Sequence, residues 1–135
     1  MRFMLFVKGN EVTEGGAMPD EEMLATMGRY NEELAKAGVL LDLSGLQPTS
    51  KGARIEYSGK KRTITDGPFT EAKEVVAGYW LIETKTRDEA IEWAKRVPFE
   101  EGAVELRQVF ELEDFEPGPA VERARELGKQ LGIVK

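Results

Sequence analysis

The amino-acid sequence predicts an α+β fold of the ferredoxin-like type, in which two helices pack on one face of an antiparallel sheet. Three observations lead to this prediction. Once a hairpin and a tail helix are set aside, strand-like and helix-like segments follow the order strand, helix, strand, strand, helix, strand. The chain has 135 residues, which suits a single domain. Its 41% hydrophobic and 33% charged residues are typical of a folded domain.

The first half of this order consists of a strand over residues 2–8 and a helix that begins at Pro19. The run Phe3–Val7 is apolar at consecutive positions, which predicts a strand covered on both faces. Pro19 suits the first position of a helix, and acidic residues follow it, as the helix dipole favours. Gly38 is expected to end this helix. Apolar residues recur between them at steps of three and four, namely Met23, Met27, Tyr30, Leu34 and Ala37.

The middle of the chain predicts two strands of the main sheet with a β-hairpin between them. Val39–Leu43 is expected to form one of these strands. The run Val75–Ile82 is the most hydrophobic in the chain and is expected to be a central strand buried on both faces. Residues 53–57 and 62–66 flank a Gly-containing loop, which predicts the hairpin.

The second helix and the last strand complete the predicted domain. Thr86 and Glu89 have the spacing of a capping box, so a helix is expected to begin there and to stop before Pro98. Its inward side is expected to consist of Ala90, Ile91, Ala94 and Val97. Residues 104–112 show the alternation of a strand that is buried on one face only.

A short tail helix is expected after Pro119, ending at Gly132. Its apolar stripe consists of Ala120, Ala124, Leu127 and Leu131. We therefore expect a ferredoxin-like domain over residues 1–112 and a helical extension over residues 113–135.

Both faces of the predicted sheet are apolar, although two helices can cover only one of them. In the first strand, Phe3, Leu5 and Val7 form one apolar set, and Met4 and Phe6 form the other. Monomers in water rarely expose an apolar patch of this size. We therefore expect a homodimer in which a second copy packs sheet against sheet.

The composition excludes several classes of function. The chain has no Cys and no His, so disulfides, thiolate nucleophiles, His bases and thiolate or imidazole metal sites are ruled out within it. A net charge of −6 argues against binding to nucleic acid. The apolar run Phe3–Val7 is too short to span a membrane or to direct export. We expect a cytoplasmic protein with no tightly bound cofactor, no metal site and no nucleic-acid or membrane partner.

Residues 65–74, Thr-Asp-Gly-Pro-Phe-Thr-Glu-Ala-Lys-Glu, followed by Gly78–Ile82, closely resemble the DGPF family of YCII-related, dimeric α/β-barrel proteins. The resemblance runs from Met1 to about Phe110. It implies a ferredoxin-like protomer, a dimer and a cleft between the helices and the sheet. Some relatives resemble small-molecule enzymes with a His–Asp pair, but the position that corresponds to the His is Met27 here. DGPF domains also occur beside sigma-factor-like proteins, which implies a transcription-related partner.

Three carboxylates are candidates for acid–base chemistry in such a cleft: Asp66, Glu74 and Asp42. Each also has a purely structural interpretation. The Asp66–Phe69 segment fits a turn in which Asp66 accepts backbone N–H groups and Phe69 fills the core. The segment after it fits a solvated loop. Asp42 fits a solvent-facing strand position. The candidate ligand-binding residues are Tyr30, Asp66, Gly67, Pro68, Phe69 and Lys73.

Two functions follow from these candidates. We favour a module that binds a small ligand or acts in regulation, linked to transcription, because His, the most versatile general base, is absent. The alternative is a small-molecule enzyme (an isomerase, a lyase or a monooxygenase-like enzyme) that uses carboxylate acid–base chemistry in the barrel cleft.

Overall fold

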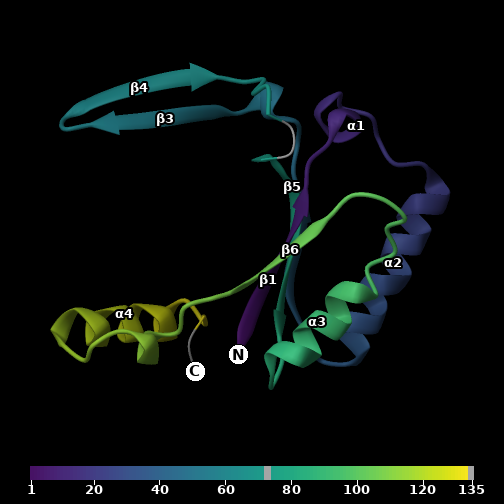
Figure 1. Ribbon diagram of the computed structural model, residues 1–135. Helices are drawn as coiled ribbons and strands as arrows, with labels where there is room; N and C mark the ends of the chain where they lie inside the picture. The colour runs from purple at the N-terminus through teal and green to yellow at the C-terminus, as the bar shows by residue number, and fades with distance from the viewer. Residues whose placement is uncertain (72–73, 134–135) are drawn as a thin grey trace.

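The main sheet has four antiparallel strands in the order β2–β5–β1–β6, with two helices packed on one of its faces (Figure 1). The computed structural model describes residues 1–71 and 74–133. The strands are β1 (Arg2–Lys8), β2 (Leu40–Gly45), β5 (Val76–Glu83) and β6 (Val104–Gln108). The longer helices are α2 (Glu21–Lys36), α3 (Arg87–Lys95) and α4 (Pro119–Gln130). The predicted ferredoxin-like α+β fold is confirmed.

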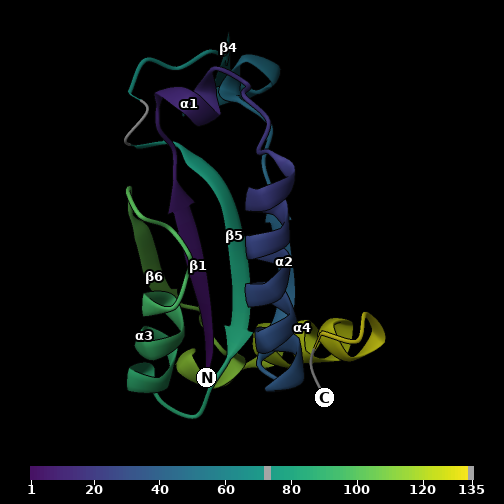
Figure 2. The same ribbon diagram turned by 90° about the vertical axis from the view of Figure 1, so that its right-hand side faces the viewer.

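The helices α2 and α3 cover the same face of the sheet (Figure 2). The α2 helix begins two residues later than predicted, because Asp20 is its N-cap and accepts the backbone N–H of Met23 at 2.8 Å. The predicted cap of α3 is confirmed, since Thr86 Oγ1 accepts the N–H of Glu89 at 3.1 Å. The Glu89 carboxylate reaches back to the N–H of Lys85 at 2.9 Å. Local capping therefore sets where both helices begin.

A short helix, α1 (Glu11–Glu14), lies between β1 and α2, where the sequence analysis expected no helix. Asn10 and Thr13 form a reciprocal capping box across it, each accepting the other's backbone N–H at 2.9 Å. This single turn follows β1 directly, and its last residue, Glu14, accepts two hydrogen bonds from Thr49.

The core lies between the sheet and the two helices. Phe3 and Leu5 of β1 and Ile82 of β5 are fully or almost fully buried there, together with Leu34 of α2. The opposite face of the sheet, which we call the open face, has half-buried apolar residues: Met4, Phe6 and Leu81. The expected burial of β1 and β5 on both faces stays a prediction about the dimer, because none of the described elements of the single chain packs over the open face (Figure 1).

Two arms project from opposite ends of the sheet, on the side of its open face (Figure 1). One is the hairpin of β3 (Ala53–Ser58) and β4 (Lys61–Asp66), whose strands meet at a turn of only two residues, with Gly59 at φ +59°. The other contains the tail helix α4, which confirms the predicted helix but leaves Leu127 and Leu131 of its apolar stripe exposed. No helix within residues 1–71 and 74–133 has the length and apolar character needed to cross a lipid bilayer.

Tyr30 connects the two helices through the core. Its side chain is 4% exposed, and its hydroxyl donates to the backbone carbonyl of Trp93 at 2.8 Å. Its ring meets that of Trp80 edge to face, with centroids 5.4 Å apart. Burial raises the pKa of Tyr30 to about 12 from its ordinary value of 10.0.

The raised pKa of Tyr30 predicts a loss of stability in alkaline solution. Between pH 10 and 12 the folded protein retains a proton that the unfolded chain releases, so the free energy of unfolding falls as the pH rises through this window. Below pH 10 the contribution is fully present, and it amounts to about 3 kcal/mol at most. Urea unfolding across this range should show a weaker pH dependence in Tyr30→Phe than in the wild type. Tyr57→Phe is the control, because the Tyr57 side chain is exposed and its loss should leave the dependence unchanged.

Candidate functional site

A cavity of about 280 Å³ lies between the middle of α2 and the sheet. It draws residues from α1, α2, β1, β2, β5 and the segment after α3. Its lining is mostly apolar, and four of its residues have neutral polar side chains, namely Thr13, Asn31, Ser44 and Tyr79. The lining residues are Val7, Thr13, Met27, Asn31, Leu43, Ser44, Gly45, Ala77, Gly78, Tyr79, Trp80 and Phe99. We call this the α2 cavity.

Trp80 forms a rigid wall of the α2 cavity. The residue is 4% exposed, and its indole Nε1 donates to Asn31 Oδ1 at 2.8 Å. The Phe99 ring lies 6.3 Å from the Trp80 ring. Since Asn31 uses its carbonyl oxygen for this bond, the group it can offer to a ligand is its amide N–H₂ donor.

Close approach of two strands shapes the rim of the cavity. A Cβ atom on Gly78 would lie 2.9 Å from the backbone oxygen of Ser44, so a side chain there would force β2 and β5 apart. Glycine at this position keeps Ser44 and Gly45 beside β5, where both line the cavity.

Among the residues that the structure describes, the titratable side chain in the lining of the α2 cavity is that of Tyr79, whose hydroxyl donates to Asp42 on the open face. Met27, the position that corresponds to a His in the family resemblance, is one of its walls. Neither a carboxylate nor a cationic side chain is among its lining residues. Within the described ranges there is also no cluster of three or more acidic side chains that could hold a metal ion. The described lining of the α2 cavity is therefore uncharged.

The Asp66–Phe69 segment is held from outside by Thr49. Thr49 Oγ1 accepts the N–H of Phe69 at 3.0 Å, while Thr49 donates its own N–H at 3.1 Å, and its hydroxyl, to the carboxylate of Glu14. The N–H of Gly67 donates to the carbonyl of Gly52 at 3.0 Å. Three stretches of chain therefore meet at this turn, around Glu14, residues 49–52 and the turn itself.

This arrangement corrects the interpretation of Asp66 as the residue that ties the turn. The Asp66 side chain is exposed and accepts no hydrogen bond from any residue of the described ranges. Phe69 does not fill the core either. It is half-buried, and the guanidinium of Arg54 lies 3.9 Å from the centre of its ring. The physical reason is that Thr49, distant in sequence, already supplies the acceptor that Asp66 was expected to provide.

The other candidate residues lie apart from the α2 cavity. Asp42 is on the open face, where its carboxylate accepts the hydroxyl of Tyr79 at 2.9 Å and the N–H of Leu43 at 2.8 Å. Glu74 is exposed, and Tyr30 is committed to the carbonyl of Trp93. Gly67 and Pro68 belong to the turn that Thr49 holds, and Lys73 lies outside the described residues. None of the described candidates, namely Tyr30, Asp42, Asp66, Gly67, Pro68, Phe69 and Glu74, lines the cavity.

Sequence reasoning missed Asn31 and Thr13 as lining residues. Asn31 is four residues after Met27 and so lies on the same side of α2, which was the available signal. Thr13 gave no such signal, because α1 itself was not predicted.

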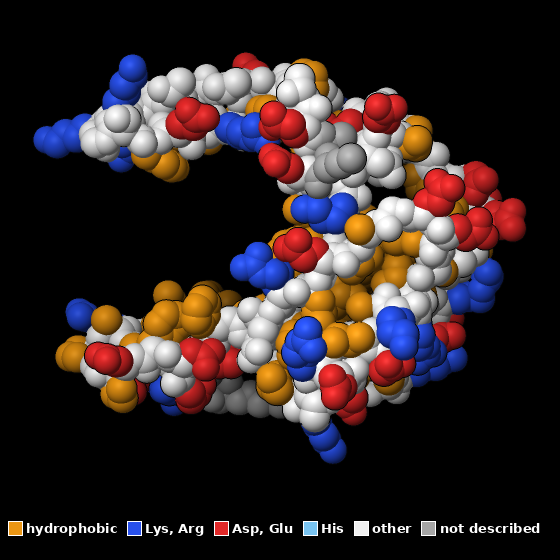
Figure 3. Space-filling model, in the orientation of Figure 1, with side chains coloured by type: hydrophobic (Ala, Val, Ile, Leu, Met, Phe, Trp, Pro, Cys, Tyr) orange, Lys and Arg blue, Asp and Glu red, His pale blue; other side chains and the backbone are white. Residues whose placement is uncertain are grey.

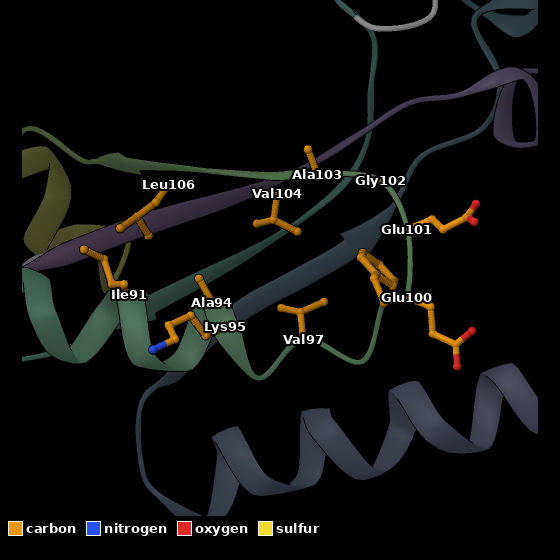
Figure 4. Close-up of a pocket in the computed structure, with 11 residues that line it drawn as sticks. Ile91, Ala94, Lys95, Val97, Glu100, Glu101, Gly102, Ala103, Val104 and Leu106 are labelled. Carbon is orange, nitrogen blue, oxygen red and sulfur yellow. The ribbon is translucent and has the colours of Figure 1, made fainter.

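A second hollow, of about 400 Å³, lies between α3 and the edge strand β6 (Figure 4). Ile91 and Ala94 on the helix face Val104 and Leu106 on the strand side, and the charged residues Lys95, Glu100 and Glu101 also line it. The carboxylates of Glu100 and Glu101 point away from it in Figure 4. Because no polar groups converge on a common point inside it, this hollow has less of the character of a ligand site than the α2 cavity.

The position of Asp66 makes a specific prediction for Asp66→Asn. Because the side chain is exposed and Thr49 supplies the acceptor for the turn, the free energy of unfolding should change by less than about 1 kcal/mol. Binding in the α2 cavity should be unchanged within a few-fold, because Asp66 is not one of its lining residues. Thermal melting of the wild type and of Asp66→Asn measures the change in stability, and ligand titration of the two proteins measures the change in binding. A variant that melts like the wild type but no longer binds would contradict it.

Comparison with known proteins places these observations in a family context. The model of the YCII-related domain matches residues 1–113. A protein of Rhizobium meliloti (strain 1021), R00369, is 28% identical over 99 residues, which is 73% of this chain and 80% of that protein. Among solved structures, 5-chloro-2-hydroxyhydroquinone dehydrochlorinase from Burkholderia phenoliruptrix AC1100, in complex with 2,5-dihydroxybenzoquinone, shares 13% identity at a TM-score of 0.48. That alignment covers 86% of this chain and all of the other.

Proposed function

The chain belongs to the YCII-related family, and from this premise we propose that it is a dimeric module that binds a small, neutral, largely apolar molecule in the α2 cavity. The observation that carries the proposal is the lining of that cavity. Aromatic and aliphatic walls combine there with the neutral polar side chains of Thr13 and Asn31. Ligand sites typically have this character, with apolar walls and a few polar groups that fix orientation.

The size and charge of the cavity limit what it would bind. Its 280 Å³ is close to the lower end, about 300 Å³, of the usual range for ligand pockets, so a molecule of one or two rings fits best. An ionised ligand would lose its hydration without gaining a charged partner, since no cation or carboxylate lines the described walls. The ligand class is therefore a neutral ring compound with one or two hydrogen-bonding groups.

The side chain of Met27 offers a direct test. With all five methionines ¹³C-labelled at their methyl groups, the protein is titrated with neutral p-cresol and, separately, with the 4-methylbenzoate anion. We expect p-cresol to shift the Met27 signal saturably, and 4-methylbenzoate to bind at least about tenfold more weakly. Met27→Leu assigns the signal. Met23, on the same helix but exposed, is the internal control.

The proposal fails if neither probe shifts the Met27 signal, or if both shift Met23 and Met27 alike. Tighter binding of 4-methylbenzoate would also contradict it, because an anion would then have found a cationic partner that the cavity lining does not provide.

The dimer is the second part of the proposal. The open face has half-buried apolar residues in two central strands, including Met4, Phe6 and Leu81, and a second copy would remove them from water. Sedimentation at micromolar concentration should give twice the 15.1 kDa mass of the chain. Leu81→Glu should shift the protein to monomer, because it would place two buried charges at the interface. A well-folded wild-type monomer would contradict the dimer.

One observation favours the enzymatic alternative. The carboxylate of Asp42 and the hydroxyl of Tyr79 form a hydrogen bond of 2.9 Å on the open face, which would be the barrel interior of a dimer. A carboxylate next to a phenol is suited to proton transfer. The alternative would be favoured if a probe were turned over by the wild type but not by Asp42→Asn, with the Met27 shift retained in the variant.

A further inference from the structure

The two arms that flank the open face have opposite charges. We define the basic arm as residues 51–66, which contain five cations and two carboxylates, and the acidic arm as residues 110–130, which contain six carboxylates and three cations. Their net charges are therefore +3 and −3. In the described chain, none of the five cations of the basic arm forms a salt bridge.

Neither arm has an apolar partner within the described chain. On the basic arm, Ile55 and Ile64 are directly opposite each other and 46% and 68% exposed, and Tyr57 is 71% exposed. On the acidic arm, Phe110 and Phe115 pack on each other with ring centroids 5.2 Å apart, yet both are exposed. Figure 3 shows hydrophobic side chains of both arms on the sides that border the hollow between them.

Isolated elements of this kind are marginally stable in water. A two-stranded hairpin without a third strand or a helix against it is barely stable, and a 12-residue helix needs tertiary packing. The two arms therefore need an external surface that combines apolar contact with charge of the opposite sign.

A second copy that faces the open face can supply that surface in two symmetric arrangements, which differ in the direction of the twofold axis. If the twofold axis runs along the strands, each arm meets its own copy, which brings +3 against +3 and −3 against −3. If the axis runs across the strands, the basic arm of one copy meets the acidic arm of the other at both ends of the sheet (Figure 1). The juxtaposition of like charges is unfavourable in the first case, and opposite charges attract in the second.

We propose that the basic arm of each protomer packs against the acidic arm of its partner, an arrangement that rests on the dimer proposed above. The apolar sides of the two arms come together, and their charged groups form the rim of the contact. The hydrophobic contact supplies affinity, and the charges select the antiparallel orientation of the two copies.

Cross-linking can determine directly which arms lie next to each other in the dimer. The chain contains no Cys, so each introduced thiol is unique. Lys60→Cys marks the tip of the basic arm, and Glu126→Cys marks the acidic arm on a chain carrying a longer tag. Each variant is expressed alone, and the two are also co-expressed, before treatment with a short bismaleimide. In the co-expressed sample we expect a cross-link between one Lys60→Cys chain and one Glu126→Cys chain. We expect little cross-linking between two Lys60→Cys chains.

Charge reversal is the second measurement. Lys60→Glu with Lys61→Glu should raise the dimer dissociation constant about tenfold or more at low salt, and less at high salt. Pairing of like arms predicts the opposite, a tighter dimer. The matched control is Lys36→Glu with Lys95→Glu, which changes the net charge equally on the helices of the other face and should leave dimerisation unchanged.

The outcomes separate this proposal from the dimer itself. A dimer that gives the mixed cross-link supports both. Three results would overturn the pairing of arms and leave the dimer intact. They are a cross-link only between two Lys60→Cys chains, a dimer without any cross-link, and a dimer that associates more tightly after charge reversal. A wild-type monomer overturns both.

Discussion

Gly67→Ala is expected to destabilise the protein strongly, although it adds only one methyl group. The added Cβ atom would lie 1.7 Å from the carbonyl oxygen of Thr49 and 2.5 Å from its carbonyl carbon. Both are backbone atoms, so a change of side-chain rotamer cannot relieve the clash. Relief requires the whole turn to move, and this would break the bonds that Thr49 makes with Phe69 and Glu14. We expect a loss of about 3 kcal/mol or more in the free energy of unfolding.

Gly28→Ala is the matched control for this substitution. Gly28 lies within α2, and an added Cβ atom there would meet nothing within 4 Å. Alanine is favoured over glycine inside a helix, so the control should be neutral or stabilising by about 0.5–1 kcal/mol. Urea unfolding at a fixed protomer concentration compares the two variants. Equal stability of Gly67→Ala and the wild type would show that the segment does not pack on the backbone of Thr49.

Leu34→Ala is expected to cost about 2–5 kcal/mol, the range for removing a buried leucine and leaving a cavity. Leu34 is fully buried in the core between α2 and the sheet. Leu24→Ala changes the same residue type in the same helix, but Leu24 is 53% exposed. That control should stay within about 0.5 kcal/mol of the wild type. A similar loss in both variants would mean that Leu34 does not carry core packing.

Much of the fold could be predicted because its signals are local. The apolar stripe of α2, the Thr86 cap of α3 and the continuous apolar run of β5 each depend on residues a few positions apart. Adjacent segments of this kind form the same structure in most contexts, so the element order identified the ferredoxin-like fold. The absence of His and Cys likewise follows from composition alone and removes whole classes of chemistry.

The Asp66–Phe69 turn shows where local reasoning fails. Asp, Gly and Pro are turn residues, so the sequence correctly indicated a turn, but not what holds it. Its acceptor is Thr49, 20 positions away from Phe69, and Thr49 is itself held by Glu14, another 35 positions away. No pattern in the sequence marks such a partner, because the three segments are distant in the chain and are brought together only by the tertiary fold.

The lining of the α2 cavity and the positions of the two arms also depend on the tertiary structure. Met27, Ser44 and Trp80 become neighbours because β2 and α2 both pack beside β5, and the register of those strands places Ser44 at the cavity rim. The charges of the arms can be counted in the sequence, yet their positions at opposite ends of one open face cannot. The sequence by itself determined which elements form and which chemistry is excluded, since both depend on residue types and short spacings. The tertiary structure decided which side chains share a cavity or a surface, because that depends on contacts between distant segments.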